Sequence, residues 1–417
     1  MTTLCGMLAC ADAACADAAP WVYAEPITIV TARDGVFHHL ESAGRRNLAV
    51  GGEVAAIVWE DNRDAAPQVY VATVRIGARN VAEALRVSTG AGAYEPAIAA
   101  VGDGQFIIVW EQDDAVWVRA LADQRLGEPQ RLAGAVSAQG SVASDGRRAI
   151  AVWSERRGNA SHIAMREIVW RGIDKPLELH APRWVDTAPP DAEQFYPAVM
   201  LNSRGTTVAW EDRRHGHTLL LVAHAPAGGK FAAAQPLNEQ PRQRSAIYGK
   251  GSGAARPVLT AWGRRGVAAA WLDKRDFTSG YDVYAGVSDD SERALGRNEK
   301  VQDEFGAAIS QWHAGIAGDA NNQLAVVWDD NRDDTGDIWI AWRTPQGWSG
   351  DHAVPGASGE GEQTNPAVAL DRRGGLHLAW IEQSEPQGPT AIKYLYAPRT
   401  PSGIEKQFPS SKISPSL

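Results

Sequence analysis

The stretch Leu324-Ala325-Val326-Val327-Trp328-Asp329-Asp330-Asn331-Arg332 is a short apolar run that ends in tryptophan and continues into aspartate and arginine. The same pattern, W-x-D-x-R after an apolar run, returns in three other places: residues 57–63, 208–214 and 269–275. Weaker copies contain three further tryptophans: Trp110, Trp153 and Trp380. The seven copies are spaced 51, 43, 57, 61, 57 and 52 residues apart. Self-similarity at such a period is typical of a propeller or a solenoid.

Each copy belongs to a unit whose pattern indicates four short strands. In the second unit the apolar or β-branched runs are residues 96–100, 106–110, 115–120 and 127–132, separated by polar turns. Such runs predict strands, and four strands repeated radially predict an all-β, seven-bladed β-propeller with four antiparallel strands per blade. Six blades is the alternative, because the second and third copies are only 43 residues apart.

The N-terminal residues 25–30 resemble the fourth strand of a unit, yet they precede the first complete unit. An open propeller would leave strand edges exposed, so we expect this strand to complete the last blade, whose other strands lie within about residues 365–398. The sequence therefore predicts a single propeller domain over residues 24–398. It is preceded by a leader, residues 1–20, and followed by a Ser- and Pro-rich tail, residues 399–417.

The composition is that of a globular protein, with 44% hydrophobic and 22% charged residues among 417 and a net charge of -9. No long basic run occurs, which argues against a nucleic-acid partner. No apolar stretch of about 18 residues occurs, so we predict no transmembrane segment. The pair His215-Gly216-His217 is the nearest approach to a metal-ligand motif, and it is better explained as a solvated loop. We predict no metal and no cofactor.

The leader holds all three cysteines of the chain: Cys5, Cys10 and Cys15. Its apolar core at residues 4–11 and the small-x-small pattern at residues 16–18 indicate a signal peptide whose positive segment lies outside the sequence given. Leu8-Ala9-Cys10 resembles a degenerate bacterial lipobox, which would make Cys10 a lipid anchor. We therefore expect a secreted, periplasmic or outer-membrane protein. The alternative is a cytoplasmic protein with a disordered Ala-rich N-terminus.

The W-x-D-x-R loop joins the second and third strands of a blade, on the face where each innermost strand starts. This top face is the usual ligand mouth of a propeller. A ring of carboxylates and guanidiniums there could recognise a polar ligand, because the arginine fork binds two carboxylate oxygens at once. The structural alternative is that Asp caps its own turn and Arg ties blades together. We favour this structural alternative for any single copy of the motif, because a residue repeated in nearly every blade usually has a structural role in the blade. The arginines concerned are Arg63, Arg214, Arg275 and Arg332.

The loops that lead into the innermost strands differ from blade to blade, and variable loops on a rigid scaffold tend to carry function. We take five residues of these loops as binding candidates: Glu95, Tyr196, Arg256, His313 and Gln363. Tyr248 and His313 are the side chains there that are suited to acid–base chemistry. Each residue taken alone is more often a surface or packing residue.

The blade phrase, P-A-V-A then a turn then V-A-W-x-D-x-R then I-Y-x-A, resembles that of sialidase-like (neuraminidase, BNR-type) propellers over residues 25–398. The Asp box that such blades carry, S-x-D-x-G-x-T-W, is eroded here to Ser288-Asp289-Asp290 and Gly347-Trp348-Ser349. Sialidases use three arginines, an Asp acid/base and a Tyr nucleophile helped by Glu. By this resemblance Asp61 matches the acid/base, as Asp212, Asp273 and Asp330 do equally well, and Tyr248 matches the nucleophile. The Arg-Ile-Pro motif that supplies the first arginine is absent.

These observations lead to three expectations of function. The first is an exported propeller that binds a glycan or a protein partner on its top face without catalysis. The alternative is a glycoside hydrolase or polysaccharide lyase of sialidase-like fold, since a fold by itself does not decide an activity. The third expectation is a protein with a purely structural role in the cell envelope.

Overall fold

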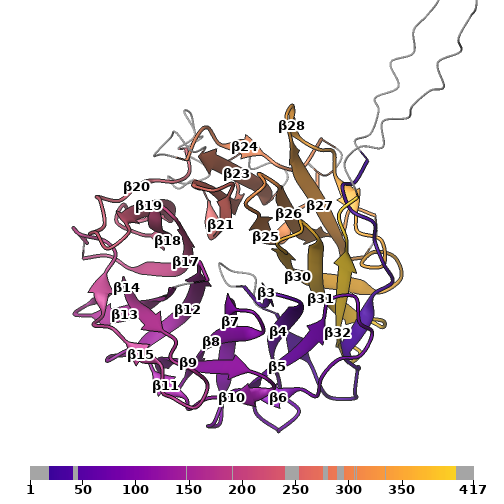
Figure 1. Ribbon diagram of the computed structural model, residues 1–417. Coiled ribbons are helices and arrows are strands. Elements are labelled where there is room, and N and C mark those ends of the chain that lie inside the picture. Colours follow the sequence, from indigo (N-terminus) through magenta and orange to yellow (C-terminus); the bar gives the residue numbers. More distant parts are fainter. Residues whose placement is uncertain are drawn as a thin grey trace, which may run out of the picture.

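Seven antiparallel sheets surround a common axis in the computed structural model of the chain (Figure 1). The structure describes residues 18–40, 46–146, 148–189, 191–239, 253–275, 280–288, 295–304, 306, 308–333 and 335–400. These ranges contain strands and turns and no helix, so none there is long and apolar enough to cross a bilayer. The predicted all-β fold and seven blades are confirmed, and the alternative of six blades is wrong.

The strands run outward from the axis within each blade. Blade 1 contains β2 (His38–His39), β3 (Leu48–Gly51), β4 (Val54–Asp61), β5 (Gln68–Arg75) and β6 (Leu85–Arg86). Blade 2 contains β7 (Ala93–Gly102), β8 (Gln105–Gln112), β9 (Ala115–Ala122), β10 (Arg125–Leu126) and β11 (Gln130–Arg131). Blade 3 contains β12 (Ser137–Ser144), β13 (Ala149–Arg157), β14 (Ala160–Val169), β15 (Glu178–Leu179) and β16 (Arg183–Trp184). Blade 4 contains β17 (Gln194–Asn202), β18 (Gly205–Asp212), β19 (Leu219–Pro226) and β20 (Gln235–Pro236).

The remaining blades keep the same order. Blade 5 contains β21 (Ala255–Trp262), β22 (Gly266–Asp273), β23 (Asp282–Ser288) and β24 (Glu299–Lys300). Blade 6 contains β25 (Trp312–Gly318), β26 (Leu324–Asp330), β27 (Asp337–Thr344), β28 (Gly347–Trp348) and β29 (His352–Ala353). Blade 7 contains β30 (Glu362–Leu370), β31 (Leu376–Gln383), β32 (Ala391–Ala397) and, from the other end of the chain, β1 (Ile27–Val30).

The N-terminal strand closes the ring as the sequence predicts. β1 lies outside β32 in blade 7, with Ile27 opposite Tyr394 and Thr28 opposite Lys393 (Figure 1). Trp21 extends this closure, since it bridges to Arg399 and is 4% exposed. The two ends of the propeller thus share one sheet, and no edge of β32 is left open.

The seven repeated tryptophans form the core between blades. All are at most 1% exposed, and each packs in a cluster with the preceding blade: Trp59 lies with Ala379 and Tyr394 of blade 7, and Trp110 with Val58 of blade 1. An indole buries about 150–250 Å². At about 25 cal/mol per Å² this is roughly 4–6 kcal/mol each, before entropic costs. The repeat therefore marks the seven interfaces between blades, as expected.

Small residues line the axis because the innermost strands approach one another closely. A Cβ atom added to Gly51 of β3 would lie 2.4 Å from the carbonyl oxygen of Gly102 in β7. One added to Gly318 of β25 would lie 2.3 Å from the carbonyl oxygen of Ala261 in β21. Both distances are shorter than side chains tolerate, so glycine is required at these contacts.

Candidate functional site

The loops between second and third strands share the top face with the starts of the innermost strands. The register shows it, because His38 lies opposite Asp61 and Gln194 lies opposite Asp212. The W-x-D-x-R motifs and the variable loops therefore meet on one face, as predicted.

The tryptophan of every motif is hydrogen-bonded to the side chain two residues later. The indole N–H donates to a carboxylate or amide oxygen at 2.7–3.2 Å in all seven blades. At Asp61 the same carboxylate accepts from the backbone N–H of Arg63 at 3.0 Å and from its guanidinium. The Nε2 atom of His38 lies 3.7 Å away, and burial lowers the pKa of this histidine. The carboxylate oxygens of Asp61 thus stabilise the turn that directly follows this residue.

The arginines of the motif repeat this arrangement in four blades. Arg214, Arg275 and Arg332 each bind the aspartate two residues earlier through the backbone N–H and the guanidinium. Three of the guanidiniums also lie about 4 Å over a ring of the next strand: Arg63 on Tyr70, Arg275 on Tyr284 and Arg332 on Trp339. This geometry supports the structural interpretation for the aspartates, which cap their own turns. The guanidiniums bind the same carboxylates, and Arg214 and Arg275 add ion pairs with Asp186 and Glu239, which lie between the strands of consecutive blades.

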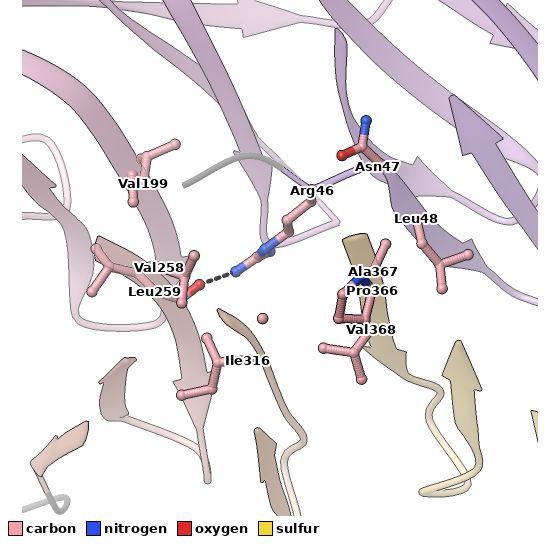
Figure 2. A pocket seen from close by; sticks show the side chains of 12 residues that line it. Arg46, Asn47, Leu48, Val199, Val258, Leu259, Ile316, Pro366, Ala367 and Val368 are labelled. Atoms are coloured by element: carbon pink, nitrogen blue, oxygen red, sulfur yellow. Dashed lines mark hydrogen bonds between the residues drawn. The ribbon is translucent and has the colours of Figure 1, made fainter. Parts of the chain in front are cut away.

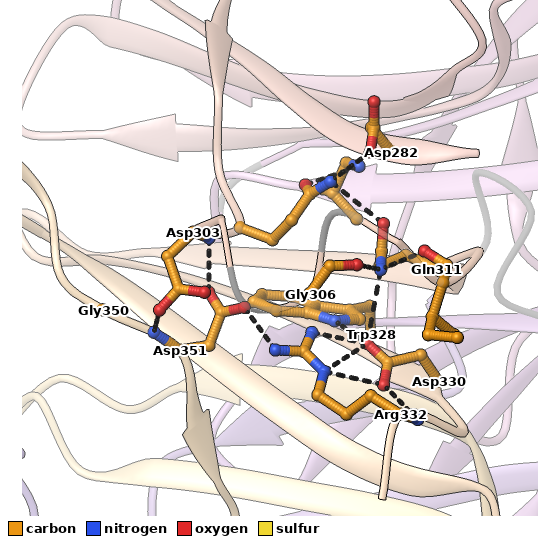
Figure 3. Close-up of polar contacts among 12 residues, drawn as sticks. Asp282, Asp303, Gly306, Gln311, Trp328, Asp330, Arg332, Gly350 and Asp351 are labelled. Atoms are coloured by element: carbon orange, nitrogen blue, oxygen red, sulfur yellow. Dashed lines mark hydrogen bonds and ion pairs between the residues drawn. The ribbon is translucent and has the colours of Figure 1, made fainter. Parts of the chain in front are cut away.

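Blade 6 shows the most enclosed version of the motif (Figure 3). The Arg332 side chain is 2% exposed and lies between Asp330, at 2.6 Å, and Asp351, at 2.7 Å. Burial raises the pKa of Asp351 to about 6, although the neighbouring guanidinium opposes the rise. Gly306 leaves room for this network, because a Cβ atom there would lie 2.3 Å from the guanidinium.

A β-bulge interrupts six innermost strands at the same position near the top face. The residue at each bulge has a positive φ of 47–60° and is not glycine: Glu95, Gln139, Tyr196, Arg256, His313 and Asn365. In each strand the register shifts around this residue. Bulges re-aim side chains, and here they direct six of them around the mouth of the propeller.

The preceding blade holds most of these bulges in place. The backbone N–H of Glu95 donates to Glu60 at 2.9 Å, and that of Arg256 donates to Glu211 at 2.9 Å. Both acceptors directly follow the repeated tryptophan of the previous blade. In blade 3 that position is Ser154, and Gln139 accepts from the N–H of Tyr196 instead, at 2.9 Å. The bulges are therefore fixed by contacts across the interfaces between blades.

Bulge residues of blades 4 and 5 bring an arginine onto an aromatic ring. The guanidinium carbon of Arg256 lies 3.3 Å from the ring centre of Tyr196, and the group also pairs with Glu211 at 3.1 Å. Tyr281 lies close enough to this pair to be affected electrostatically. Burial raises its pKa, and the Glu211 carboxylate adds to the rise while Arg256 opposes it. The amine of Lys274 lies 3.9 Å over the Tyr281 ring.

Blade 6 adds an exposed indole and a histidine–aspartate pair. Trp312 is 43% exposed, and its ring meets Tyr281 edge-on at 5.3 Å. The next residue, His313, places Nδ1 2.7 Å from Asp329. Together with Tyr196 and Arg256 of blades 4 and 5, these residues form one cluster that we call the aromatic patch, in which Glu211 and Asp329 are buried beneath the more exposed side chains. Its members are Tyr196, Glu211, Arg256, Lys274, Tyr281, Trp312, His313 and Asp329.

The sequence candidates lie in four places: the aromatic patch, the bulge of blade 2, the inside of blade 7 and the motif turns. Tyr196, Arg256 and His313 lie in the aromatic patch, and Glu95 occupies the equivalent bulge of blade 2. Gln363 is 2% exposed inside blade 7, where its amide donates to Glu360. Asp61 and the four arginines are in the motif turns. Tyr248, and the leader with Cys10, lie outside the described residues.

The candidates taken from the sequence do not include five members of the patch: Glu211, Lys274, Tyr281, Trp312 and Asp329. A usable signal existed for the two acids, since both directly follow a repeated tryptophan. In the part of the chain that the structure describes, no three His, Cys, Asp or Glu side chains are arranged to hold a metal ion.

Comparisons with known proteins concern the fold. No family model and no curated protein matches the sequence. A polysaccharide lyase, Uly1, matches with a TM-score of 0.56 and 8% identity over 85% of this chain and 90% of that chain. An α-L-arabinanase of Penicillium chrysogenum, complexed with arabinobiose, matches with a TM-score of 0.48 and 11% identity over 89% and 98%. An α-L-arabinofuranosidase of Fusarium graminearum matches with 0.48 and 10% over 89% and 97%. At 8% identity the match to the polysaccharide lyase shows a similar fold and nothing beyond it.

Proposed function

We propose that this protein binds a carbohydrate chain at the aromatic patch on its top face. The observation that carries the proposal is the convergence of three bulge side chains with the exposed Trp312 and with Tyr281 on one surface. Flat aromatic faces suit the apolar faces of sugar rings, and polar groups around them fix the orientation of a ligand. Arg256 and Lys274 are cations that suit carboxylate groups on such a chain.

The test is a glycan array followed by calorimetric titration of the glycans that bind. Replacing Trp312 by alanine removes the exposed indole, so we expect affinity to fall by roughly tenfold, about 1.4 kcal/mol. The matched control is Tyr94→Ala, because Tyr94 has the same 43% exposure and also directly precedes a bulge, but in blade 2. Equal losses in both variants, or no glycan binding by the wild type, would refute the proposal.

A second candidate function is cleavage of the bound chain as a glycoside hydrolase or lyase. The observation that favours it is the pair His313–Asp329, since a carboxylate that orients an imidazole is a common acid–base arrangement. Product release should then be measured on every glycan that binds, with His313→Asn and Asp61→Asn compared. Loss of turnover in H313N with retained binding supports catalysis at the patch. Loss only in D61N would support the acid/base role that the sialidase resemblance implies.

Relationship to the sialidase-like propellers and export from the cell are further parts of this proposal. Export rests on the Ala-rich leader, and lipid attachment rests on Cys10 within the Leu8-Ala9-Cys10 sequence. Fractionation of a bacterial host, with Cys10→Ala as the comparison, tests both. Release of the variant from the membrane fraction is the expected result if Cys10 is lipidated.

A further inference from the structure

The axial channel contains an arginine, Arg46, for which the described residues supply no countercharge. Arg46 lies two residues before the start of β3, and its side chain crosses the channel toward β21 (Figure 2). There the guanidinium donates to the carbonyl oxygen of Leu259. No carboxylate of the described residues forms an ion pair with it. Burial lowers the pKa of Arg46 to about 10, so the group is still charged at neutral pH.

The surroundings of this charge are apolar. Val258, Ile316 and Val368 line the channel around Arg46, together with the backbone of the innermost strands (Figure 2). A charge enclosed by such groups is unfavourable unless it has a partner, and an opposite charge is attracted more strongly there than in bulk water. A guanidinium has five N–H donors, and Leu259 satisfies one. Among the described residues no other hydrogen-bond acceptor is found for this guanidinium.

That space is large enough for a small organic ion and is open to the bottom face. Below Arg46 the channel widens into a cavity of about 250 Å³, which reaches residues 144, 201 and 261. The same residues line a second cavity of about 620 Å³ at the bottom mouth. One water molecule takes up about 30 Å³ in the liquid. The inner cavity is several times larger, so it alone has room for a small organic ion.

The bottom mouth also favours entry of an anion. Arg264 and Arg372 both line it. Arg372 has an exposed ion pair with Asp103 at 3.3 Å, whereas no described carboxylate pairs with Arg264. Asp145, the acid at the mouth, lies 3.4 Å from Arg148. Exposed cations at the mouth of a narrow channel raise the local concentration of anions and so their rate of entry.

We propose that the axial channel is a binding site for one small carboxylate ion, which enters at the bottom face and is held by Arg46. The planar guanidinium matches a carboxylate because two parallel N–H groups can donate to its two oxygens. This site lies in the channel and not in the aromatic patch, so it does not depend on the proposed carbohydrate binding.

The test is calorimetric titration of the full-length protein with sodium acetate and, separately, sodium glucuronate at constant ionic strength. We expect saturable binding of one ion per chain, weakened roughly tenfold or more in Arg46→Gln because the charged fork is lost. Arg264→Gln should weaken binding only a few-fold, since it acts at the mouth. If the protein binds acetate but not glucuronate, the site takes small free acids. If it binds both ions, the site also takes sugar acids.

Controls separate this site from the patch and from a folding defect. Arg256→Gln, at the patch, should leave acetate affinity unchanged. If Arg46→Gln fails to fold, Arg46→Lys keeps the charge but loses the fork and should still weaken carboxylate binding. Unchanged acetate binding in a folded Arg46 variant, or an equal response of the wild type to chloride, would overturn the assignment.

Discussion

Arg332 shows how much one side chain of the repeated motif contributes to stability. Its guanidinium is almost fully buried between two carboxylates, so removing it leaves two buried negative charges without a countercharge. We predict that Arg332→Met lowers the free energy of unfolding by about 3–5 kcal/mol, measured in urea. Arg63→Met is the matched control, because that side chain is 27% exposed and pairs with a single carboxylate. Its loss should be clearly smaller, and equal losses would contradict this interpretation.

His377 predicts a dependence of stability on pH. Its ring is fully buried, with Nδ1 2.6 Å from the Tyr394 hydroxyl and Nε2 3.3 Å from Asp371. Burial lowers the pKa of His377 below that of the unfolded chain, about 6.5, although Asp371 opposes the shift. The unfolded chain therefore binds the proton more readily. Stability from this group is fully present above pH 6.5 and decreases as the pH falls below it.

The measurement is the free energy of unfolding between pH 7.5 and 5, an interval chosen to span about 6.5. His377→Gln should reduce the loss of stability on acidification, whereas His180→Gln, at an exposed histidine, should not. The raised pKa of Asp351, about 6, has the opposite sign, because the folded chain binds that proton first. Asp351 is present in all three proteins, so it cancels in the comparison. An identical pH profile for H377Q and the wild type would refute the prediction.

The bulge is the element that shapes the top face, and it depends on the neighbouring blade. A non-glycine residue in the left-handed region costs roughly 1–2 kcal/mol, so the bulge persists only where other contacts enforce it. We predict that Glu211→Ala destabilises the protein by about 1–3 kcal/mol, because the N–H and the guanidinium of Arg256 both lose their acceptor. Glu211→Gln retains an acceptor oxygen and should cost less, as measured by urea unfolding. Indistinguishable variants would show that the bulge does not need this contact.

The elements also show which parts of the structure the sequence could predict. The blades were predictable, because a tryptophan that repeats about every 50 residues and strand patterns of period two are local signals. The bulges were not, since Tyr196 and Arg256 carry no local mark of a positive φ. Their acceptors lie in the preceding unit, tens of residues away. The loop candidates Glu95, Tyr196, Arg256 and His313 were chosen only for their variability along the repeat, and the structure places all four at one register position.

The same limit applies to the channel and to the patch. Arg46 follows a short polar segment, residues 41–45, whose sequence does not indicate that the Arg46 side chain reaches the axis, and its partner Leu259 is 213 residues away. Tyr281 belongs to the patch through its contact with Trp312 of blade 6, and Lys274 belongs to it through Tyr281 of its own blade. Sequence periodicity therefore predicts the structural features that every blade repeats. The patch and the channel are formed by side chains that differ from blade to blade.

At the scale of the whole molecule, closure by β1 makes the seven blades one cooperative unit. Each blade buries its tryptophan against the preceding one, so a ring without its closing strand exposes the edge of β32 and loosens the interface of blades 7 and 1. We predict that deleting residues 1–31 lowers the midpoint of thermal unfolding, broadens the transition and promotes self-association through the free edge. Deleting residues 1–17 alone is the matched control and should leave both properties unchanged. Size-exclusion chromatography and calorimetry measure the two effects. If the longer deletion stayed monomeric and unfolded in the same sharp transition, the contacts between tryptophan clusters would be sufficient to hold the ring without the closing strand.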